Sequence, residues 1–516
     1  MTDENSTPAS GEPTSETPAP AETDHRSRPR SKAFIDFITS KWAPRRQADV
    51  APSRAVPFTA ARRAQVAQQF PGARLVFPAG PLKVRSNDTD YRFRPHSAFA
   101  HLTGLGTDQE PDAVLVLHPV EPGTGDGGGD HHAVLYVRPL AARDTEEFFA
   151  DARYGEFWIG ARPSLADITT LTGIEARHID ELRDALAKDV GAGVVLLVVT
   201  GADEAIETLV EAIVAEAGAD QAERPLTDEA LVRAASEVRL VKDELEIEQM
   251  REAVDATIEG FAEVVRNLPR AVAHRRGERV IETTFDAHAR LEGNAVGYET
   301  IAAAGEHATT LHWITNDGVV RDGDLVLLDA GVEVESLYTA DVTRTLPVSG
   351  TYTAVQRRVY QAVLDAADAA FEAARPGNRF RDVHAAAMKV IAARLEEWGL
   401  LPEGVTAEIA LTDEGQQHRR WMVHGTSHHL GIDVHDCAQA RQDLYQDGVL
   451  EPGMIFTIEP GLYFKADDLA VPEEYRGIGV RIEDDVLITA EGNENLSAAL
   501  PRDPDAVEAW MASLRG

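Results

Sequence analysis

The chain has 516 residues, of which 43% are hydrophobic, and its 86 acidic and 50 basic residues give a formal net charge of −36 at pH 7. One hydrophobic core of ordinary size does not accommodate this length, so we expect two domains. The negative charge argues against binding to nucleic acid or to an anionic membrane, since both need a basic face. The only cysteine, Cys437, excludes an internal disulfide and fits a reducing compartment.

The first 50 residues differ from the rest in composition. Residues 1 to about 32 are mainly Ser, Thr, Pro, Glu and Ala with almost no bulky apolar side chain, which predicts a disordered, acidic and proline-rich tail. From Ser31 the segment turns basic and gains aromatic residues, which leaves open a short helix or a solvated extension. Because this region lacks the pattern of a secretory signal and no apolar run reaches the length of a membrane span, we expect a cytoplasmic protein.

Residues 55–225 have the pattern of an α/β domain. Short apolar runs, typical of buried strands, alternate with helical segments. Residues 203–218 repeat their apolar side chains every three or four positions, as a helix packed on a sheet does. The loop at residues 121–132 ends in His131 and His132, which we interpret as solvated rather than as metal ligands. The predicted strands are residues 74–78, 113–118, 133–137 and 193–199.

The pattern changes near Pro225, and we place the domain boundary at residues 221–229. Charge-rich helical sequence is followed by mixed strand-like and helical segments, which predicts an α+β domain over residues 230–516. Its clearest helix begins at a capping box, with Thr353 and Gln356 three positions apart. The other predicted elements are helices at residues 227–267 and 381–398 and strands at residues 324–328, 341–348, 454–459 and 479–488.

Four histidines crowd into the stretch WMVHGTSHHLGIDVHD, residues 421–436. They are His424, His428, His429 and His435, and small or apolar residues surround them. Imidazoles are unusual in such surroundings. This stretch alone leaves two interpretations with even support, a histidine-rich surface loop and a metal site.

Four carboxylates and one of these imidazoles stand inside apolar, strand-like runs rather than in polar loops. A buried carboxylate is costly without a positive charge beside it, and each residue alone is best explained by pairing with an arginine or a backbone amide. Together they favour metal ions, because four carboxylates and one imidazole balance two divalent cations. Such oxygen-rich ligands suit Mn²⁺, with Co²⁺ or Zn²⁺ as substitutes. The five residues are Asp329, Asp341, His428, Glu459 and Glu483.

The motifs around these residues form an ordered set that resembles aminopeptidase P, the Xaa-Pro aminopeptidases of the pita-bread metallopeptidase family M24B. The set is LDAG, ADVTRT, HGTSHHLGIDVHD, MIFTIEPGLY and YRGIGVRIEDDVLIT. The segment KVRSNDTDYRFRPHSAFAHLTG is similar to the family's N-terminal domain, so the resemblance covers nearly everything from residue 55 onward. It implies an α/β N-terminal domain followed by an α+β pita-bread (creatinase/aminopeptidase-like) catalytic domain.

The resemblance implies a role for each ligand. Asp329 binds one metal ion, His428 and Glu459 bind the other, and Asp341 and Glu483 bridge both. A hydroxide between the two ions attacks the carbonyl of the first residue, whose α-amino group lies on the metal bound by Asp329. Glu459 accepts and relays the proton of this nucleophile.

Three histidines are implied to face the substrate. By the resemblance, His435 donates to the substrate carbonyl, and His312 and His424 line the proline pocket. Without the resemblance, His312 is equally well explained as a core histidine beside Trp313.

Two further residues are implied to support the ligands. Arg481 lies two positions before Glu483, so both face the same side of a strand, and Arg481 orients ligands from behind them. Tyr463 contacts the substrate or the same ligands. In an extended segment His429 points away from the metal that its neighbour His428 binds, and we expect it to pack only.

The predicted activity is removal of the first residue from peptides with proline second, whose imide bond fits ordinary aminopeptidases poorly. The nearest alternative is an Xaa-Pro dipeptidase (prolidase). A non-catalytic binding module and a metal-free enzyme of the creatinase type are disfavoured because all five ligand residues are present. The resemblance also implies association through the N-terminal domain as a homo-oligomer, a dimer or a tetramer.

Overall fold

The structure is a computed structural model that describes residues 31–45, 49–218 and 226–515. The prediction of a disordered tail over residues 1–30 lies outside these residues. The chain divides into two compact units. The first comprises the described part of Met1–Gln47 together with Lys83–Tyr91 and Leu140–Arg162, and the second comprises Ala48–Leu82, Arg92–Pro139 and Pro163–Gly516.

The first unit is small and aromatic. Ser31 caps helix α1, because its hydroxyl accepts a hydrogen bond from the backbone amide of Phe34, and a short helix is therefore present in the segment where two interpretations were open. Trp42 packs edge-to-face against Phe148, with ring centroids 5.6 Å apart. The elements of this unit are α1 (Lys32–Ile38), α4 (Glu147–Ala150), α5 (Glu156–Ile159) and the hairpin of β2 (Val84–Ser86) and β3 (Thr89–Asp90).

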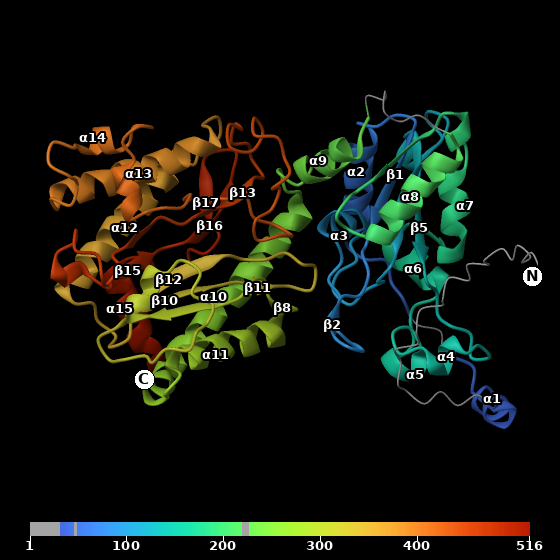
Figure 1. The fold of residues 1–516 in the computed structure, drawn as a ribbon, viewed down its shortest axis with the longest axis horizontal. Coiled ribbons are helices and arrows are strands. Elements are labelled where there is room, and N and C mark those ends of the chain that lie inside the picture. The colour runs from blue at the N-terminus through green and yellow to red at the C-terminus, as the bar shows by residue number, and fades with distance from the viewer. Residues whose placement is uncertain (1–30, 46–48, 219–225, 516) are drawn as a thin grey trace, which may run out of the picture. The chain divides into compact units, whose positions relative to one another are not determined.

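The N-terminal part of the second unit is built on a five-stranded sheet with the order β6-β5-β4-β1-β7 (Figure 1). The side chains of its inner strands point alternately to the two faces of the sheet, and each face has its own hydrophobic core. Leu75 and Phe77 pack in the core on one face, and Val76 packs in the core on the other. The strands are β1 (Ala73–Pro78), β4 (Val114–Pro119), β5 (His131–Val137), β6 (Glu175–His178) and β7 (Val195–Val198). The helices are α2 (Val56–Ala67), α3 (Ser97–Thr103), α6 (Leu165–Thr172), α7 (Leu182–Ala187) and α8 (Glu204–Glu216).

This sheet confirms the predicted α/β class and contains all four predicted strands. Strand β6 was not predicted, because this edge strand is polar and none of its residues is fully buried. His131 corrects a second expectation. Its side chain is buried, and its Nε2 lies 2.8 Å from the carbonyl oxygen of Ala73, so it is not solvated.

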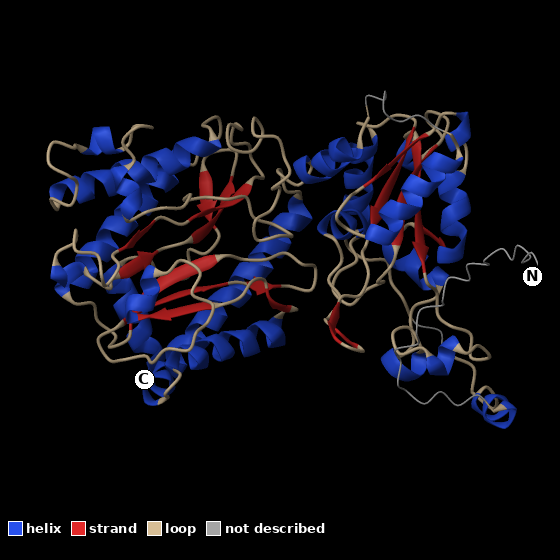
Figure 2. Cartoon of the chain, in the orientation of Figure 1, coloured by secondary structure: helices blue, strands red, loops and turns tan. Residues whose placement is uncertain are grey.

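The C-terminal part has several small antiparallel sheets between two pairs of helices (Figure 2). The predicted capping box is present: the Thr353 hydroxyl accepts from the Gln356 amide, and the Gln356 side chain accepts from the Thr353 amide. The helix predicted at residues 227–267 is two helices, and Asp243 caps the second. Helices here are α9 (Asp228–Glu237), α10 (Glu244–Ala273), α11 (Gly277–Glu292), α12 (Ala354–Ala373), α13 (Phe380–Glu397), α14 (Ala407–Ala410) and α15 (Pro504–Arg515).

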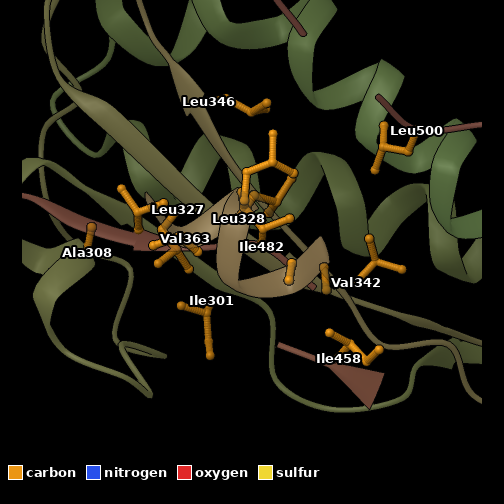
Figure 3. Packing of buried hydrophobic residues seen from close by; sticks show 14 of the residues in the cluster. Ile301, Ala308, Leu327, Leu328, Val342, Leu346, Val363, Ile458, Ile482 and Leu500 are labelled. Carbon is orange, nitrogen blue, oxygen red and sulfur yellow. The ribbon is translucent and has the colours of Figure 1, made fainter. Parts of the chain in front are cut away.

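Three of these sheets supply the core of this part. The strand orders are β12-β10-β9, β13-β16-β17 and β14-β15, and β11 (Val332–Glu333) pairs with β8 (Ala295–Val296). Every residue of β10 and β12 is buried. Side chains from β9, β10, β12, β13 and α12 meet in one core (Figure 3). The strands are β9 (Ile301–Ala304), β10 (Leu325–Ala330), β12 (Val342–Pro347), β13 (Ile455–Ile458), β14 (Gly461–Tyr463), β15 (Gly479–Arg481), β16 (Asp484–Ile488) and β17 (Asn493–Asn495).

A buried ion pair joins two of these sheets. Arg344 of β12 and Asp484 of β16 are both inaccessible to solvent, and an Arg344 Nη2 to Asp484 Oδ1 distance of 2.7 Å links them. Arg344 also donates to the carbonyl oxygens of Glu483 and Leu500. The guanidinium thus satisfies both the charge of Asp484 and the backbone where the sheets meet. Among the described residues, no helix is both long and apolar enough to span a bilayer.

Replacing Arg344 with methionine should lower the free energy of unfolding by about 3 kcal/mol, because Asp484 would stay buried without its closest counter-charge and would keep only Arg502, whose Nε lies 3.4 Å from its Oδ2. Urea unfolding followed by circular dichroism measures the effect. Arg266→Met is the matched control, since its pair with Glu263 is exposed and should contribute less than about 1 kcal/mol. Equal unfolding midpoints for the two variants would contradict this assignment.

Candidate metal centre

Asp329 and Asp341 meet at one end of the β10–β12 pair. Asp329 is the fifth residue of β10 and Asp341 directly precedes β12, and the antiparallel register pairs Asp329 with Thr343. The Tyr298 hydroxyl lies 2.7 Å from Asp329 Oδ1 and 2.5 Å from Asp341 Oδ1. Because a phenol has one hydrogen, it donates to one of these carboxylates at a time.

Glu459 and Glu483 meet in the same way at the end of the β13–β16 pair. Glu459 directly follows β13, Glu483 directly precedes β16, and the register pairs Ile458 with Asp484. A backbone bridge between Thr343 and Glu483 joins this pair to the β10–β12 pair. The Thr343 hydroxyl also donates to Glu483 Oε2 at 2.6 Å. Two strand pairs therefore gather four carboxylates that are far apart in the sequence.

His428 reaches this cluster from an irregular segment that runs beside β13. The backbone amide of Thr457 donates to the carbonyl of His428. The Nε2 atom of His428 lies 3.2 Å from Asp341 Oδ2 and 3.9 Å from Glu459 Oε1. One ligand atom each from Asp341, His428 and Glu483 lie within 4.8 Å of one another, an arrangement that suits a metal ion. Asp329 and Glu459 border this group of three.

The cluster is short of positive charge. Burial raises the pKa of Asp329 and, even more, that of Glu483, where the charges of Asp341 and Glu459 add to the effect. Burial likewise raises the pKa of Glu459. Among the described residues, Arg481 is the only arginine or lysine that forms an ion pair with any of the four carboxylates. The set of four carboxylates, one imidazole and one guanidinium therefore fits divalent cations that prefer oxygen ligands.

The pKa of His428 shifts in the opposite direction from those of His424 and His435. Although burial alone would lower its pKa, the hydrogen bond to Asp341 and the charges of Asp341 and Glu459 raise it to about 9. Burial and the charge of Arg481 lower the pKa of His424 to about 3. Burial and the charge of His428 lower that of His435.

The predicted substrate-facing histidines surround the cluster. The ring of His435 lies 4.4 Å from that of His428, and Nδ1 of His424 lies 3.5 Å from Glu459 Oε2. His312 is exposed, and it is close enough to lower the pKa of both His424 and His435. The structure thus brings all three imidazoles near the carboxylates.

Arg481 and Tyr463 lie behind the carboxylates. The guanidinium of Arg481 donates to Asp329 Oδ2, to the Thr343 hydroxyl and to the Tyr463 hydroxyl. The hydroxyl of Tyr463 also lies 2.8 Å from His424 Nε2. One chain of hydrogen bonds therefore connects Asp329 with His424.

His429 points into the core, where its ring stacks on Phe380 with centroids 4.7 Å apart. Two groups that the sequence reasoning missed are Tyr298 and Thr343. Thr343 is two positions from Asp341 on an extended strand, so the period of two would have placed it on the same face. Tyr298 stands in an irregular segment, and only the tertiary fold reveals its contacts.

An α/β domain followed by small sheets that gather carboxylates and a histidine is the organisation of a pita-bread metallopeptidase. Residues 248–490 match the model of metallopeptidase family M24, and residues 59–196 match that of the aminopeptidase P N-terminal domain. The chain belongs to the aminopeptidase P family.

Similar proteins support this assignment over nearly the whole chain. Xaa-Pro aminopeptidase 1 of Streptomyces coelicolor is 52% identical over 487 residues, which cover 94% of this chain and 93% of the relative. A substrate complex of an Escherichia coli aminopeptidase P variant superposes with a TM-score of 0.74 at 31% identity and covers 90% of this chain and 99% of its own. Proline aminopeptidase P II from Yersinia pestis gives a TM-score of 0.71 at 33% identity and covers 88% and 98% of the two chains.

Binding of Mn²⁺ should release protons and strengthen as the pH rises. A raised pKa means that His428 holds a proton at neutral pH in the metal-free protein, and a metal ion must displace it. The apparent affinity should rise up to about tenfold per pH unit for each proton released between about pH 6 and pH 8. Calorimetric titration in buffers of different ionisation enthalpy measures the number of protons that are released on Mn²⁺ binding.

His132→Gln is the control for this titration, since His132 also has a raised pKa but pairs with Asp126 and Glu175 away from the cluster. It should leave proton release unchanged, whereas His428→Ala should reduce it. An affinity that is independent of pH would contradict the prediction.

Proposed function

We propose that this chain is a metallo-aminopeptidase that hydrolyses the bond between the first residue of a peptide and a proline in the second position. The observation that carries the proposal is the convergence of three buried carboxylates, the half-buried Glu459 and His428, with Arg481 as the single balancing guanidinium among the described residues. The relatives named above supply the substrate class, because their names describe Xaa-Pro aminopeptidases.

The ligand assignment is part of the proposal. Asp329 holds one divalent ion, His428 and Glu459 hold the other, and Asp341 and Glu483 contact both. Mn²⁺ is the first candidate, and Co²⁺ and Zn²⁺ are alternatives. When bound, the ions supply the positive charge that activates a water molecule and polarises the scissile carbonyl.

Glu459 and the histidines around the ions transfer protons and orient the substrate. Glu459, whose half-buried carboxyl has a raised pKa, accepts and returns a proton beside the reacting bond. His435 and His424 have lowered pKa values, so both imidazoles are neutral at neutral pH. A neutral His435 still donates one N–H to the substrate carbonyl.

Four further residues are assigned to substrate binding and to orienting the metal ligands. His312 and His424 line the pocket for the proline ring. Tyr463 and Arg481 fix the positions of His424 and Asp329 through their shared hydrogen bonds.

The remaining proposals concern the domain bounds, the oligomeric state and the cellular location of the chain. Residues 55–225 form the N-terminal domain and residues 230–516 the catalytic domain, and the chain associates through the N-terminal domain as a dimer or tetramer. The family resemblance supports this division and this association. A cytoplasmic location is proposed from the acidic composition and the single cysteine.

Activity should depend on peptide length and on metal. A series of Xaa-Pro, Xaa-Pro-Xaa and longer peptides, assayed with and without added Mn²⁺, tests this by product analysis. Tripeptides should be cleaved well above the rate for the dipeptide, because a free carboxylate directly after proline is not required. Activity restricted to dipeptides would instead favour an Xaa-Pro dipeptidase, and no activity with Mn²⁺ would favour a binding module.

Asp341→Ala should abolish peptidase activity and reduce bound metal while the protein stays folded, because it removes a ligand proposed to contact both ions. Metal content by mass spectrometry and circular dichroism separate loss of metal from loss of fold. Asp443→Ala, which removes an exposed carboxylate, is the control and should behave like the unmodified protein. Near-normal turnover by Asp341→Ala would refute the ligand assignment.

A further inference from the structure

The segment that carries His312 lies outside regular secondary structure. Among the described residues, it runs from the short 3-10 helix at Gly305–Thr309 to the start of β10 without a strand or an α-helix. Strand ladders therefore do not fix the position of His312. A pocket wall needs a defined position, because small displacements of a substrate-contacting group are costly.

One buried carboxylate receives hydrogen bonds from this whole segment. Glu278, in the first turn of α11, is fully buried. Each of its two oxygens accepts two hydrogen bonds. The donors are the Ala304 amide (2.9 Å) and His307 Nδ1 (2.7 Å) on Oε1, and Trp313 Nε1 (2.9 Å) and the Gly318 amide (2.6 Å) on Oε2.

These donors lie on both sides of His312. His307 precedes it and Trp313 follows it directly, and their rings stack with centroids 3.9 Å apart. The backbone amide of Glu278 donates in return to the Gly318 carbonyl. A Cβ atom at Gly318 would lie 2.6 Å from Glu278 Oε2, so the segment lies directly against the carboxylate. The contacts thus fix the chain before and after His312 at one point.

We propose that Glu278 is a positioning residue of the substrate pocket, which holds the His312 segment and keeps His312 beside His424 and His435. The inference rests on the proposed function, in which His312 contacts the substrate. It requires a carboxylate in particular. A carboxylate accepts all four hydrogen bonds, whereas the amide of glutamine has one acceptor oxygen and an NH₂ group that would face two donors.

Glu278→Gln should therefore raise KM for an Xaa-Pro tripeptide roughly tenfold, with a smaller change in kcat and unchanged metal content. Hydrogen exchange followed by mass spectrometry should show faster exchange over residues 304–318, which tests the positioning without any activity. Glu306→Gln, the same change at an exposed position in the same segment, is the control and should alter neither quantity.

A double-mutant cycle separates positioning from general stabilisation. His312→Ala alone should raise KM, and adding Glu278→Gln to it should give little further increase, because the group that Glu278 positions is gone. An equal increase in KM with and without His312 would overturn the proposal. If Glu278→Gln does not fold, Trp313→Phe, which removes one of the four donors, should give a smaller increase in KM that His312→Ala likewise cancels.

The outcomes also separate this inference from the proposed function. Absence of peptidase activity in the unmodified protein with Mn²⁺ would refute the proposed function, and the exchange measurement would still report on the segment. An active protein in which His312→Ala raises KM and Glu278→Gln does not would refute only the role of Glu278.

Discussion

The uncompensated negative charge of the carboxylate cluster is the constraint on which the rest of this structure depends. Asp329, Asp341 and Glu483 are almost fully buried, and two strand pairs bring them together with Glu459. Concentrating carboxylates in this way costs folding free energy, and the raised pKa values of Asp329, Glu459 and Glu483 express that cost. A fold that retains such a cluster needs a cation at this place, and a divalent metal meets the need.

The same domain contains buried carboxylates that have their counter-charges, and the contrast identifies the centre. Asp436 is fully buried, but Arg239 lies 2.9 Å and Lys242 3.4 Å from it. Although burial opposes it, the charges of these two residues lower the pKa of Asp436. Asp484 likewise has counter-charges, since Arg344 lies 2.7 Å and Arg502 3.4 Å from its carboxylate. Burial alone therefore does not indicate a metal ligand, whereas several carboxylates gathered around a single guanidinium do.

Much of the architecture could be predicted because it follows from local patterns. The apolar runs that predict β1, β4, β5 and β7 and the capping box of α12 depend on neighbouring residues only. The proposed ligands were recognisable because each is a polar side chain inside an apolar run of the sequence, although among them only Asp329 lies within a strand of the structure. The polar edge strand β6 lacked such a signal. The start of α10 had one, the capping box of Asp243 and Glu246, and the break between α9 and α10 was missed because this signal was not used.

The groups that support the centre were less predictable for the same reason. Tyr298 and Glu278 stand in stretches of ordinary composition, and their importance comes from partners 31 or more and 26 or more positions away in the chain. A sequence pattern records which residues share a face, but not which distant donors meet one carboxylate. Supporting residues of this kind become visible only when the hydrogen bonds of an irregular segment are followed to their acceptors.

The histidines of residues 421–436 show how partners, rather than residue type, set chemical roles. His428 is half-buried and its neighbour His429 is buried, yet the pKa of His428 is raised to about 9 and that of His429 is lowered to about 3. Burial lowers both pKa values, so the difference comes from the carboxylates of Asp341 and Glu459 beside His428 and from the charge of Lys242 near His429. Because side chains alternate along an extended segment, one faces the carboxylates and the next faces the core. A count of histidines therefore overestimates the ligands, and the position of the carboxylates decides which imidazole can bind a metal ion.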